Sequence, residues 1–222
     1  MAKNKMIVFA NQKGGTGKST LCMMMAHWLA DQGKKVVVYD ADVQQTFYKQ
    51  RQDDLAANPG LTPAWEVKPI NILNFDLTVK ILNEAAEFPG YVLIDAPGTL
   101  PFPGLAPILQ MADAIAIPFG YDYKQLQSTL TFIEVLLSEE IGKDKKRLFY
   151  IPNRIEVNFE TADEKRQAAE INFKLNHVGT VTHVIKKAKT LLRVDTINYN
   201  RYQLLATQGP FTTITNALKR LK

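Results

Sequence analysis

Short apolar runs alternate with longer segments of mixed polarity along the first two thirds of this chain. Runs of about strand length that are apolar at every position are typical of strands buried on both faces of a parallel sheet. They cover Met6–Ala10, Val36–Tyr39, Tyr91–Ile94, Ala114–Pro118 and Leu148–Ile151. Helix-length segments separate them, at Ser19–Gln32, Thr46–Ala57, Asp76–Phe88, Leu105–Met111 and Tyr123–Glu140. This alternation predicts an α/β fold with a doubly wound, mostly parallel sheet and helices on both faces.

Length and composition fit one domain. The chain has 222 residues, of which 46% are hydrophobic and 22% charged, and we expect residues 1–222 to form a single domain. Because the first predicted strand begins at Met6, we expect no helix-turn-helix domain ahead of it. No run approaches the ~20 apolar residues that cross a bilayer, and Met6–Ala10 is too short for a signal peptide. These features predict a cytoplasmic protein.

The cysteine count excludes one class of redox protein. The single cysteine, Cys22, lies in an apolar helical run, where we expect it to be buried. Two subunits sharing an iron–sulfur cluster would each need to supply two cysteines. A reductase similar to the nitrogenase iron protein is therefore excluded.

A glycine-rich loop directly follows the first predicted strand. Residues 11–20 read Asn-Gln-Lys-Gly-Gly-Thr-Gly-Lys-Ser-Thr. Glycines let backbone N–H groups approach an anion, and the helix that begins near Lys18 directs its positive end to the same place. Lys18 can reach the β- and γ-phosphates, and the Ser19 hydroxyl can bind magnesium. We therefore predict a site for ATP and Mg²⁺ formed by Gly14, Gly15, Thr16, Gly17, Lys18, Ser19 and Thr20.

The loop departs from the strict P-loop pattern at Gln12 and carries a second lysine, Lys13, before the glycine pair. Lys-Gly-Gly-x-Gly-Lys-Ser is the deviant Walker A motif, and the sequence resembles the ParA/MinD family of P-loop ATPases, most closely its ParA branch. In that family the lysine equivalent to Lys13 reaches the partner's nucleotide across a dimer interface. The resemblance implies a homodimer formed with ATP, in which Lys13 and Lys18 act in catalysis.

Two aspartates close the second predicted strand. Asp40 and Asp42 are two positions apart and face the same side of an extended backbone. The family usually has Asp-x-Asp-Pro-Gln here, so the resemblance implies that Asp42 orients the attacking water and that Asp40 lies near the metal. Val43 replaces the usual proline, which leaves the path of the loop open. Capping of the following helix is the alternative for both aspartates.

Two later strand ends complete the predicted site. Tyr91–Gly98 resembles the family's Walker B segment and switch loop, which implies that Asp95 holds magnesium through water and that Gly98 brings an N–H group near the γ-phosphate. Ile151–Arg154 resembles the segment near the adenine, where Asn153 could bond the base edge; a strand-end turn is the alternative. Ligands of such folds bind beyond the carboxyl ends of the strands, where Asn11, Asp40 and Asp95 should converge.

Charge is unevenly distributed. Residues 1–140 carry a net charge of −4, whereas residues 141–222 hold 16 Lys and Arg against 7 Asp and Glu, a net charge of +9. A basic segment indicates a nucleic-acid or acidic membrane surface, or else a solvated exterior. ParA-like ATPases bind DNA nonspecifically through C-terminal basic residues. The resemblance implies one patch for double-stranded DNA, made of Lys186, Lys187, Lys189, Arg193, Lys219 and Arg220.

The end of the chain has apolar residues at helical spacing, namely Phe211, Ile214, Leu218 and Leu221, beside basic ones. We expect this stripe to pack on the domain. A basic amphipathic helix on a membrane is the alternative.

The resemblance implies a ParA-type ATPase of DNA (plasmid) partition, associated with the nucleoid. Its magnesium-dependent hydrolysis would be slow until stimulated by a ParB-like activator protein bound to cargo. Two alternatives remain. One is a MinD-like membrane-cycling positioning ATPase. The other is a small-molecule ligase or synthetase on a P-loop scaffold, for which the sequence identifies no substrate pocket.

Overall fold

The computed structural model describes residues 4–98, 102–139, 141, 144, 147–156 and 161–220. Within them, seven strands form one sheet in the order β3-β2-β4-β1-β5-β6-β7, and every pairing is parallel. The strands are β1 (Lys5–Phe9), β2 (Val36–Asp40), β3 (Glu66–Pro69), β4 (Tyr91–Asp95), β5 (Ala114–Phe119), β6 (Leu148–Pro152) and β7 (Thr180–Val181). The predicted fold class is confirmed, and the five predicted strands are its five central ones.

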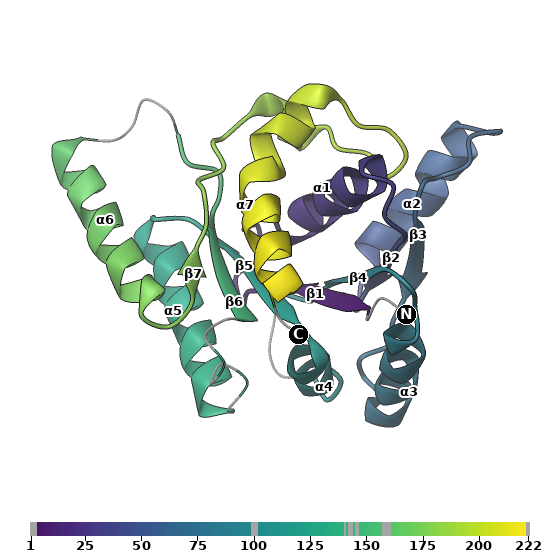
Figure 1. The fold of residues 1–222 in the computed structure, drawn as a ribbon, viewed down its shortest axis with the longest axis horizontal. Helices are drawn as coiled ribbons and strands as arrows, with labels where there is room; N and C mark the ends of the chain where they lie inside the picture. The colour runs from purple at the N-terminus through teal and green to yellow at the C-terminus, as the bar shows by residue number, and fades with distance from the viewer. Residues whose placement is uncertain are drawn as a thin grey trace.

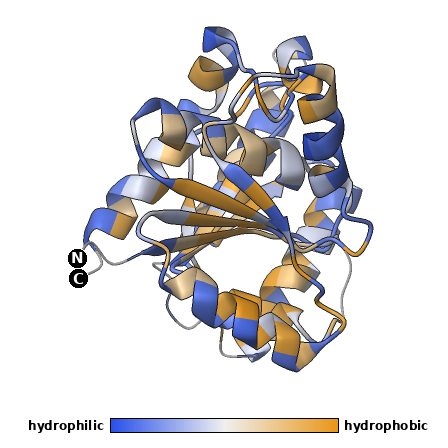
Figure 2. Ribbon diagram, turned by 90° about the vertical axis from the view of Figure 1, so that its right-hand side faces the viewer, coloured by the Kyte–Doolittle hydropathy of each residue, from blue (hydrophilic) through white to orange (hydrophobic). Residues whose placement is uncertain are grey.

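Helices cover both faces of the sheet (Figures 1 and 2). One layer holds α1 (Lys18–Asp31), α2 (Thr46–Ala57) and α7 (Arg201–Arg220). The opposite layer holds α3 (Phe75–Ala86), α4 (Leu105–Met111), α5 (Tyr123–Ser138) and α6 (Ala162–Asn176). Successive residues of each strand point to alternate layers: Ile7 and Phe9 pack against α1, whereas Met6 and Val8 pack in the other core. Both faces of the central strands are therefore buried from solvent, which explains their unbroken apolar runs.

Helix starts follow the capping chemistry of the sequence. Asn74 accepts a hydrogen bond from Leu77 N at the start of α3, and Asp122 accepts one from Gln125 N at the start of α5. Thr161 and Glu164 bond each other's backbone N–H in a capping box at the start of α6. These side chains fix where the loops at the carboxyl edge of the sheet turn into helices.

The apolar stripe of the C-terminal helix packs on the domain, as predicted. Phe211, Ile214 and Leu218 are at most 1% exposed, and the Phe211 ring lies 5.9 Å from that of Trp28 in α1. Leu221, the fourth predicted member of the stripe, lies outside the described residues. No described helix is long and apolar enough to cross a bilayer. The three described residues of the stripe are therefore part of the core.

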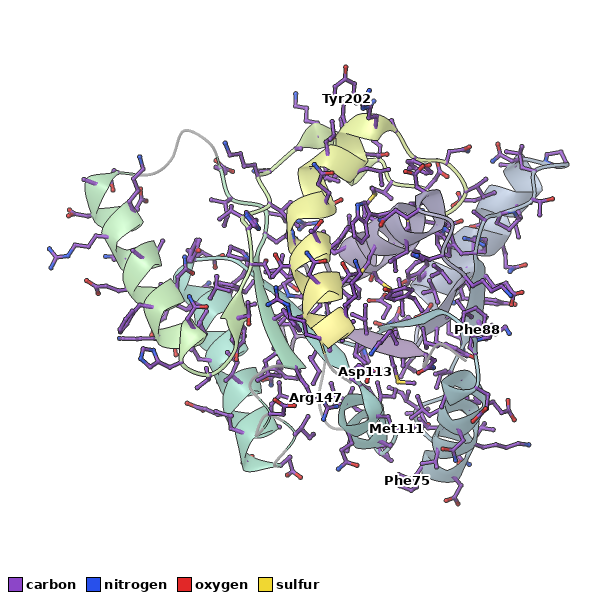
Figure 3. The ribbon with its side chains drawn as sticks, in the orientation of Figure 1. Phe75, Phe88, Met111, Asp113, Arg147 and Tyr202 are labelled. Carbon is purple, nitrogen blue, oxygen red and sulfur yellow. The ribbon has the colours of Figure 1, made fainter. Side chains whose placement is uncertain are left out.

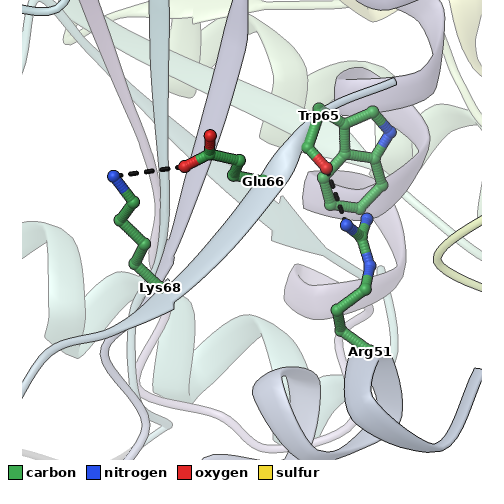
Figure 4. Close-up of polar contacts among 4 residues, drawn as sticks. All are labelled: Arg51, Trp65, Glu66 and Lys68. Carbon is green, nitrogen blue, oxygen red and sulfur yellow. Dashed lines mark hydrogen bonds and ion pairs between the residues drawn. The ribbon is translucent and has the colours of Figure 1, made fainter. Parts of the chain in front are cut away.

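Arg51 joins α2 to the segment that precedes α7. Its guanidinium donates to Trp65 O at 2.6 Å, to Thr196 O at 2.7 Å and to Thr196 Oγ1 at 2.9 Å (Figure 4 shows the Trp65 contact). The same group stacks over the Trp65 ring, 4.1 Å from its centroid. Thr196 in turn donates to Asp54 from its N–H and its hydroxyl. Burial lowers the pKa of Arg51 to about 10, so the group stays charged at neutral pH.

His27 belongs to the same buried network and is neutral. The indole N–H of Trp65 can only donate, and it lies 3.3 Å from His27 Nδ1, so that nitrogen accepts. Nε2 therefore carries the proton and donates to Asp195 O at 3.0 Å. Burial lowers the pKa of His27, which keeps the ring in this form. The network fixes residues 194–196 against α1 and α2.

Arg51→Met should destabilise the protein by about 2–4 kcal/mol, because it leaves buried oxygens of Trp65 and Thr196 without donors while keeping most of the side-chain volume. The free energy of unfolding in urea measures this. Arg166→Met is the matched control, because Arg166 is exposed on α6 and forms an exposed ion pair with Glu170; it should change stability by under about 0.5 kcal/mol. Equal losses in the two variants would refute the role of the network.

Candidate nucleotide-binding site

The strand order brings the predicted site residues to one edge of the sheet. Strands β2, β4 and β1 are neighbours, and their carboxyl ends lie in register: Asp40 stands beside Asp95, and Asp95 beside Phe9. The glycine-rich loop leaves β1 at this point and leads into α1. The predicted convergence of the three strand ends is confirmed.

The loop needs its glycines for conformation and for space. Gly15 and Gly17 have φ angles of 77° and 97°, in the left-handed region that glycine enters freely. A Cβ atom on Gly17 would lie 2.3 Å from Nδ2 of Asn153. Asn11 anchors the start of the loop to β5 and α5, because its buried amide donates to Pro118 O at 2.8 Å and to Thr129 Oγ1 at 2.9 Å.

Lys18 and Lys13, the two predicted catalytic lysines, lie in different environments. Lys18 is only 8% exposed, and its ammonium group contacts Lys13 O at 3.4 Å. Gly98 packs directly against it, since a Cβ there would come within 3.3 Å of Nζ. Burial lowers the pKa of Lys18, whereas the charges of Asp95 and Asp42 act in the opposite direction. Lys13 is exposed on the loop, and its catalytic role stays a prediction.

Asp95 is the most strongly perturbed carboxyl group of the site. Burial raises its pKa to about 7, helped by the charge of Asp40 and opposed by a hydrogen bond from the Ser19 hydroxyl and by the charge of Lys18. Its Oδ1 atom is buried and accepts no hydrogen bond from the described residues. A buried oxygen without a donor, next to a serine hydroxyl, fits a hydrated Mg²⁺, which uses few protein ligands and keeps several waters. Asp95 and Ser19 are the residues that would hold it.

Asp40 caps the start of α2, which was the alternative interpretation of this residue. Its Oδ1 accepts from Asp42 N at 3.0 Å and its Oδ2 from Tyr48 N at 2.9 Å. A role near the metal stays a prediction for Asp40. Asp42 is partly exposed, accepts from Gln44 N at 2.8 Å, and lies close enough to Lys18 and Asp95 to affect the pKa of both. Its place beside the loop fits the predicted orientation of a water molecule, which stays untested.

Asn153 and Arg154 contact the loop from the end of β6. Asn153 Nδ2 donates to Thr16 O at 2.7 Å, and Arg154 Nη1 donates to Gly15 O at 2.6 Å. Asn153 also lines a cavity of about 100 Å³ together with Thr20 and residues 186–188 and 191–192. The predicted contact of Asn153 with an adenine stays a prediction, because the structure shows this amide bonded to the loop. Sequence reasoning gave Arg154 no role; its one signal was a polar pair directly after a buried strand.

The six basic residues proposed as a DNA patch are all exposed and lie in two parts of the chain, residues 186–193 and the last turn of α7; their contact with DNA stays a prediction. Lys186 and Lys187 lie beside Ile155. Arg193 lies beside the start of α7, where Gln203 donates to Arg193 O and Thr190 O; Tyr202 marks this end of the helix in Figure 3. Lys219 and Arg220 close the same helix, roughly 27 Å away at ~1.5 Å per residue. Lys187 is also engaged, with Nζ 2.5 Å from Glu156 Oε1. The 20-residue helix α7 separates the two parts, which the sequence alone could not place.

Fold and site together define a P-loop nucleotide-binding protein. The model of the CobQ/CobB/MinD/ParA nucleotide binding domain matches residues 7–196. The chain belongs to this family, as its resemblance to ParA and MinD predicted.

Comparisons with individual proteins agree with this family assignment. The chain is 28% identical over 166 residues to the chromosome-partitioning ATPase Soj of Thermus thermophilus, a match that covers 64% of this chain and 65% of that protein, just under two thirds. An McdA variant of Cyanothece in complex with ATP has the same fold, with a TM-score of 0.71 at 18% identity and coverage of 100% and 99% of the two chains. The structure of pNOB8 ParA bound to nonspecific DNA also has this fold, with a TM-score of 0.66 at 14% identity and coverage of 99% of this chain and 100% of that chain.

Asp95→Asn should change how stability depends on pH in the absence of nucleotide and magnesium. The pKa of Asp95 is about 7 in the folded protein, against an ordinary value of 3.8. Between these values the folded state holds a proton that the unfolded state has lost, so stability falls as the pH rises through this window. Asparagine does not titrate, so the variant should lose less stability than the parent between about pH 5 and pH 8. Urea unfolding at both pH values tests this, and equal changes in the two proteins would contradict it.

Proposed function

We propose that this protein is a ParA-type ATPase that binds ATP with magnesium and dimerises around it. The observation that supports this most directly is the pair of lysines on one glycine loop. Lys18 is buried beside Asp95, whereas Lys13 is exposed at the rim. An enzyme that completed its site within one chain would have no evident need for the second lysine. A cation that projects outward suits the nucleotide of a second copy of the chain.

The residues divide the chemistry of phosphoryl transfer among them. The N–H groups of residues 14–20 and the Lys18 ammonium bind the phosphates. Ser19 and Asp95 would hold the magnesium ion, which would neutralise charge on the phosphates. Asp42 orients the attacking water, and Lys13 of the partner stabilises the transferred phosphoryl group. Because part of the machinery arrives in trans, turnover is slow until dimerisation and an activating partner align the site.

We propose that the protein binds DNA and that its function is the partition of DNA, such as a plasmid. The exposed cluster of Lys186, Lys189 and Arg193 offers positive charge without groups for base readout, which suits nonspecific binding to phosphates. The pNOB8 ParA, which shares this fold, is bound to nonspecific DNA. A ParB-like protein on the cargo would stimulate hydrolysis and release the dimer. In this scheme the protein is cytoplasmic and associated with the nucleoid.

The alternatives receive less support from the molecule. A MinD-like membrane cycle needs an apolar helix face, and the described stripe of α7 is buried. A ligase needs polar groups free to bind a substrate. A cavity of about 550 Å³ does lie beside Arg154, between α5 and α6. However, Asp122 and Glu164 on its wall cap helices, and Glu156 pairs with Lys187.

Lys18→Ala should abolish ATP-dependent dimerisation, because it removes the buried cation that binds the phosphates. Asp42→Ala is the matched variant: it should bind ATP and dimerise like the parent while its turnover falls about 100-fold or more. Sedimentation with ATP or ADP and a phosphate-release assay measure the two properties. Dimers of Lys18→Ala with ATP would refute the loop assignment, and normal turnover of Asp42→Ala would refute its water-orienting role.

Binding to nonspecific double-stranded DNA tests the function itself, with ATP, with ADP and without nucleotide over a salt series. We expect strong binding only with ATP, weakening steeply with salt because counterions are released. Changing both Lys189 and Arg193 to alanine removes four charges from a dimer and should reduce the magnitude of the slope of log K against log salt by about 3–4. The same change at Lys219 and Arg220 shows whether the second group takes part. Absence of DNA binding in every nucleotide state would overturn the proposal.

A further inference from the structure

Two side chains outside the phosphate loop bind two consecutive carbonyl groups of the loop. Gly15 O accepts from the Arg154 guanidinium at 2.6 Å, and Thr16 O accepts from the Asn153 amide at 2.7 Å. Donor and acceptor are 139 and 137 residues apart, so these contacts do not arise from local chain geometry. Both donors stand on the backbone directly after β6, whose position is fixed by Asn153 N bonding Phe119 O at 2.8 Å in β5.

The planar peptide bond converts these contacts into an orientation of the loop's donors. In a trans peptide the C=O and the following N–H point in opposite directions. Turning Gly15 O toward Arg154 therefore turns Thr16 N–H away from it, and turning Thr16 O toward Asn153 does the same for Gly17 N–H. With positive φ angles at Gly15 and Gly17, two successive donors face one side, as in an anion-binding nest.

The backbone of Arg154 is itself unusual. Its φ angle is 60°, in the left-handed region that residues with a Cβ rarely enter. Arg154 is exposed, so burial does not impose this conformation. Strained residues of this kind persist where the surrounding structure requires a particular direction of the chain, and they gather at functional sites. Here the direction places the guanidinium on Gly15 O.

We propose that Arg154, assisted by Asn153, is a positioning residue for ATP binding: it holds the Gly15 carbonyl outward so that the loop's N–H groups face the phosphates. This inference rests on the proposed function, because it assumes that the loop binds ATP. Arg154 acts on the nucleotide through the loop backbone. It differs in this from Lys18 and Lys13, which act on the phosphates by charge.

The test compares the dissociation constant of a fluorescent ATP analogue with Mg²⁺ for the parent and its variants. Arg154→Ala should weaken binding about tenfold, through loss of one charge-assisted hydrogen bond. Arg154→Lys keeps a cationic donor and should recover most of the affinity. Arg154→Gly removes the donor but relieves the left-handed backbone, so it should fold at least as well as the parent and still bind about tenfold more weakly. Arg166→Ala, on an exposed ion pair of α6, is the control and should bind like the parent.

Salt separates positioning from simple charge attraction. The tenfold difference should persist in about 0.5 M KCl, where interactions between exposed charges are screened. Its disappearance there would overturn the proposal, as would parental affinity in both Arg154→Ala and Arg154→Gly, or an equal loss in Arg166→Ala. Failure of the parent itself to bind ATP would instead refute the proposed function, so the two failures are distinguishable.

Discussion

Desolvation of the Lys18–Asp95 pair is the constraint on which the site depends. Both groups lie at the carboxyl edge of the sheet with little access to water, and burial shifts their pKa values in opposite directions, down for Lys18 and up for Asp95. Their attraction opposes both shifts without cancelling them. A site built this way favours ligands that supply compensating charge to each member: phosphate oxygens to the ammonium group, and a divalent cation to the carboxyl group. Magnesium with a nucleoside triphosphate does both at once.

The order of the strands places that pair. Strand β4 lies between β1 and β2, although two helices (α2 and α3) and the edge strand β3 separate it from β2 in the chain. Asp95 is therefore paired in register with Asp40 on one side and lies beside the end of β1, where the glycine loop begins, on the other. The two hydrophobic cores then hold the three strands in position, because alternate residues of each strand pack in opposite cores. A slip of one residue in β4 would exchange its layers and move Asp95 away from Lys18.

The sequence could predict what depends on local pattern. The central strands could be predicted because every position in them is apolar. The loop could be predicted because its glycines, lysine and serine are spaced as phosphate binding requires. Strand β3 was missed because Glu66 and Lys68 are exposed and only Val67 is buried; Figure 4 shows the first two joined by an ion pair. Strand β7 has only two residues, and α6 is too polar to reveal its core-facing Leu175 by pattern. The contacts of Asn153 and Arg154 with the loop join distant parts of the chain, and no spacing rule reports such pairs.

The separation of the two basic groups has a consequence for any dependence of DNA binding on nucleotide. The group at residues 186–193 is connected to the phosphate loop by a continuous series of hydrogen bonds. Ile155 N donates to Ile185 O, Lys187 N donates to Ile155 O, and the neighbouring Arg154 bonds Gly15 O. Lys219 and Arg220 sit at the far end of α7, whose apolar stripe is fixed in the core. A change at the loop therefore has a short structural route to the first group, whereas a route to the second group runs through α1 and the length of α7, which packs on it.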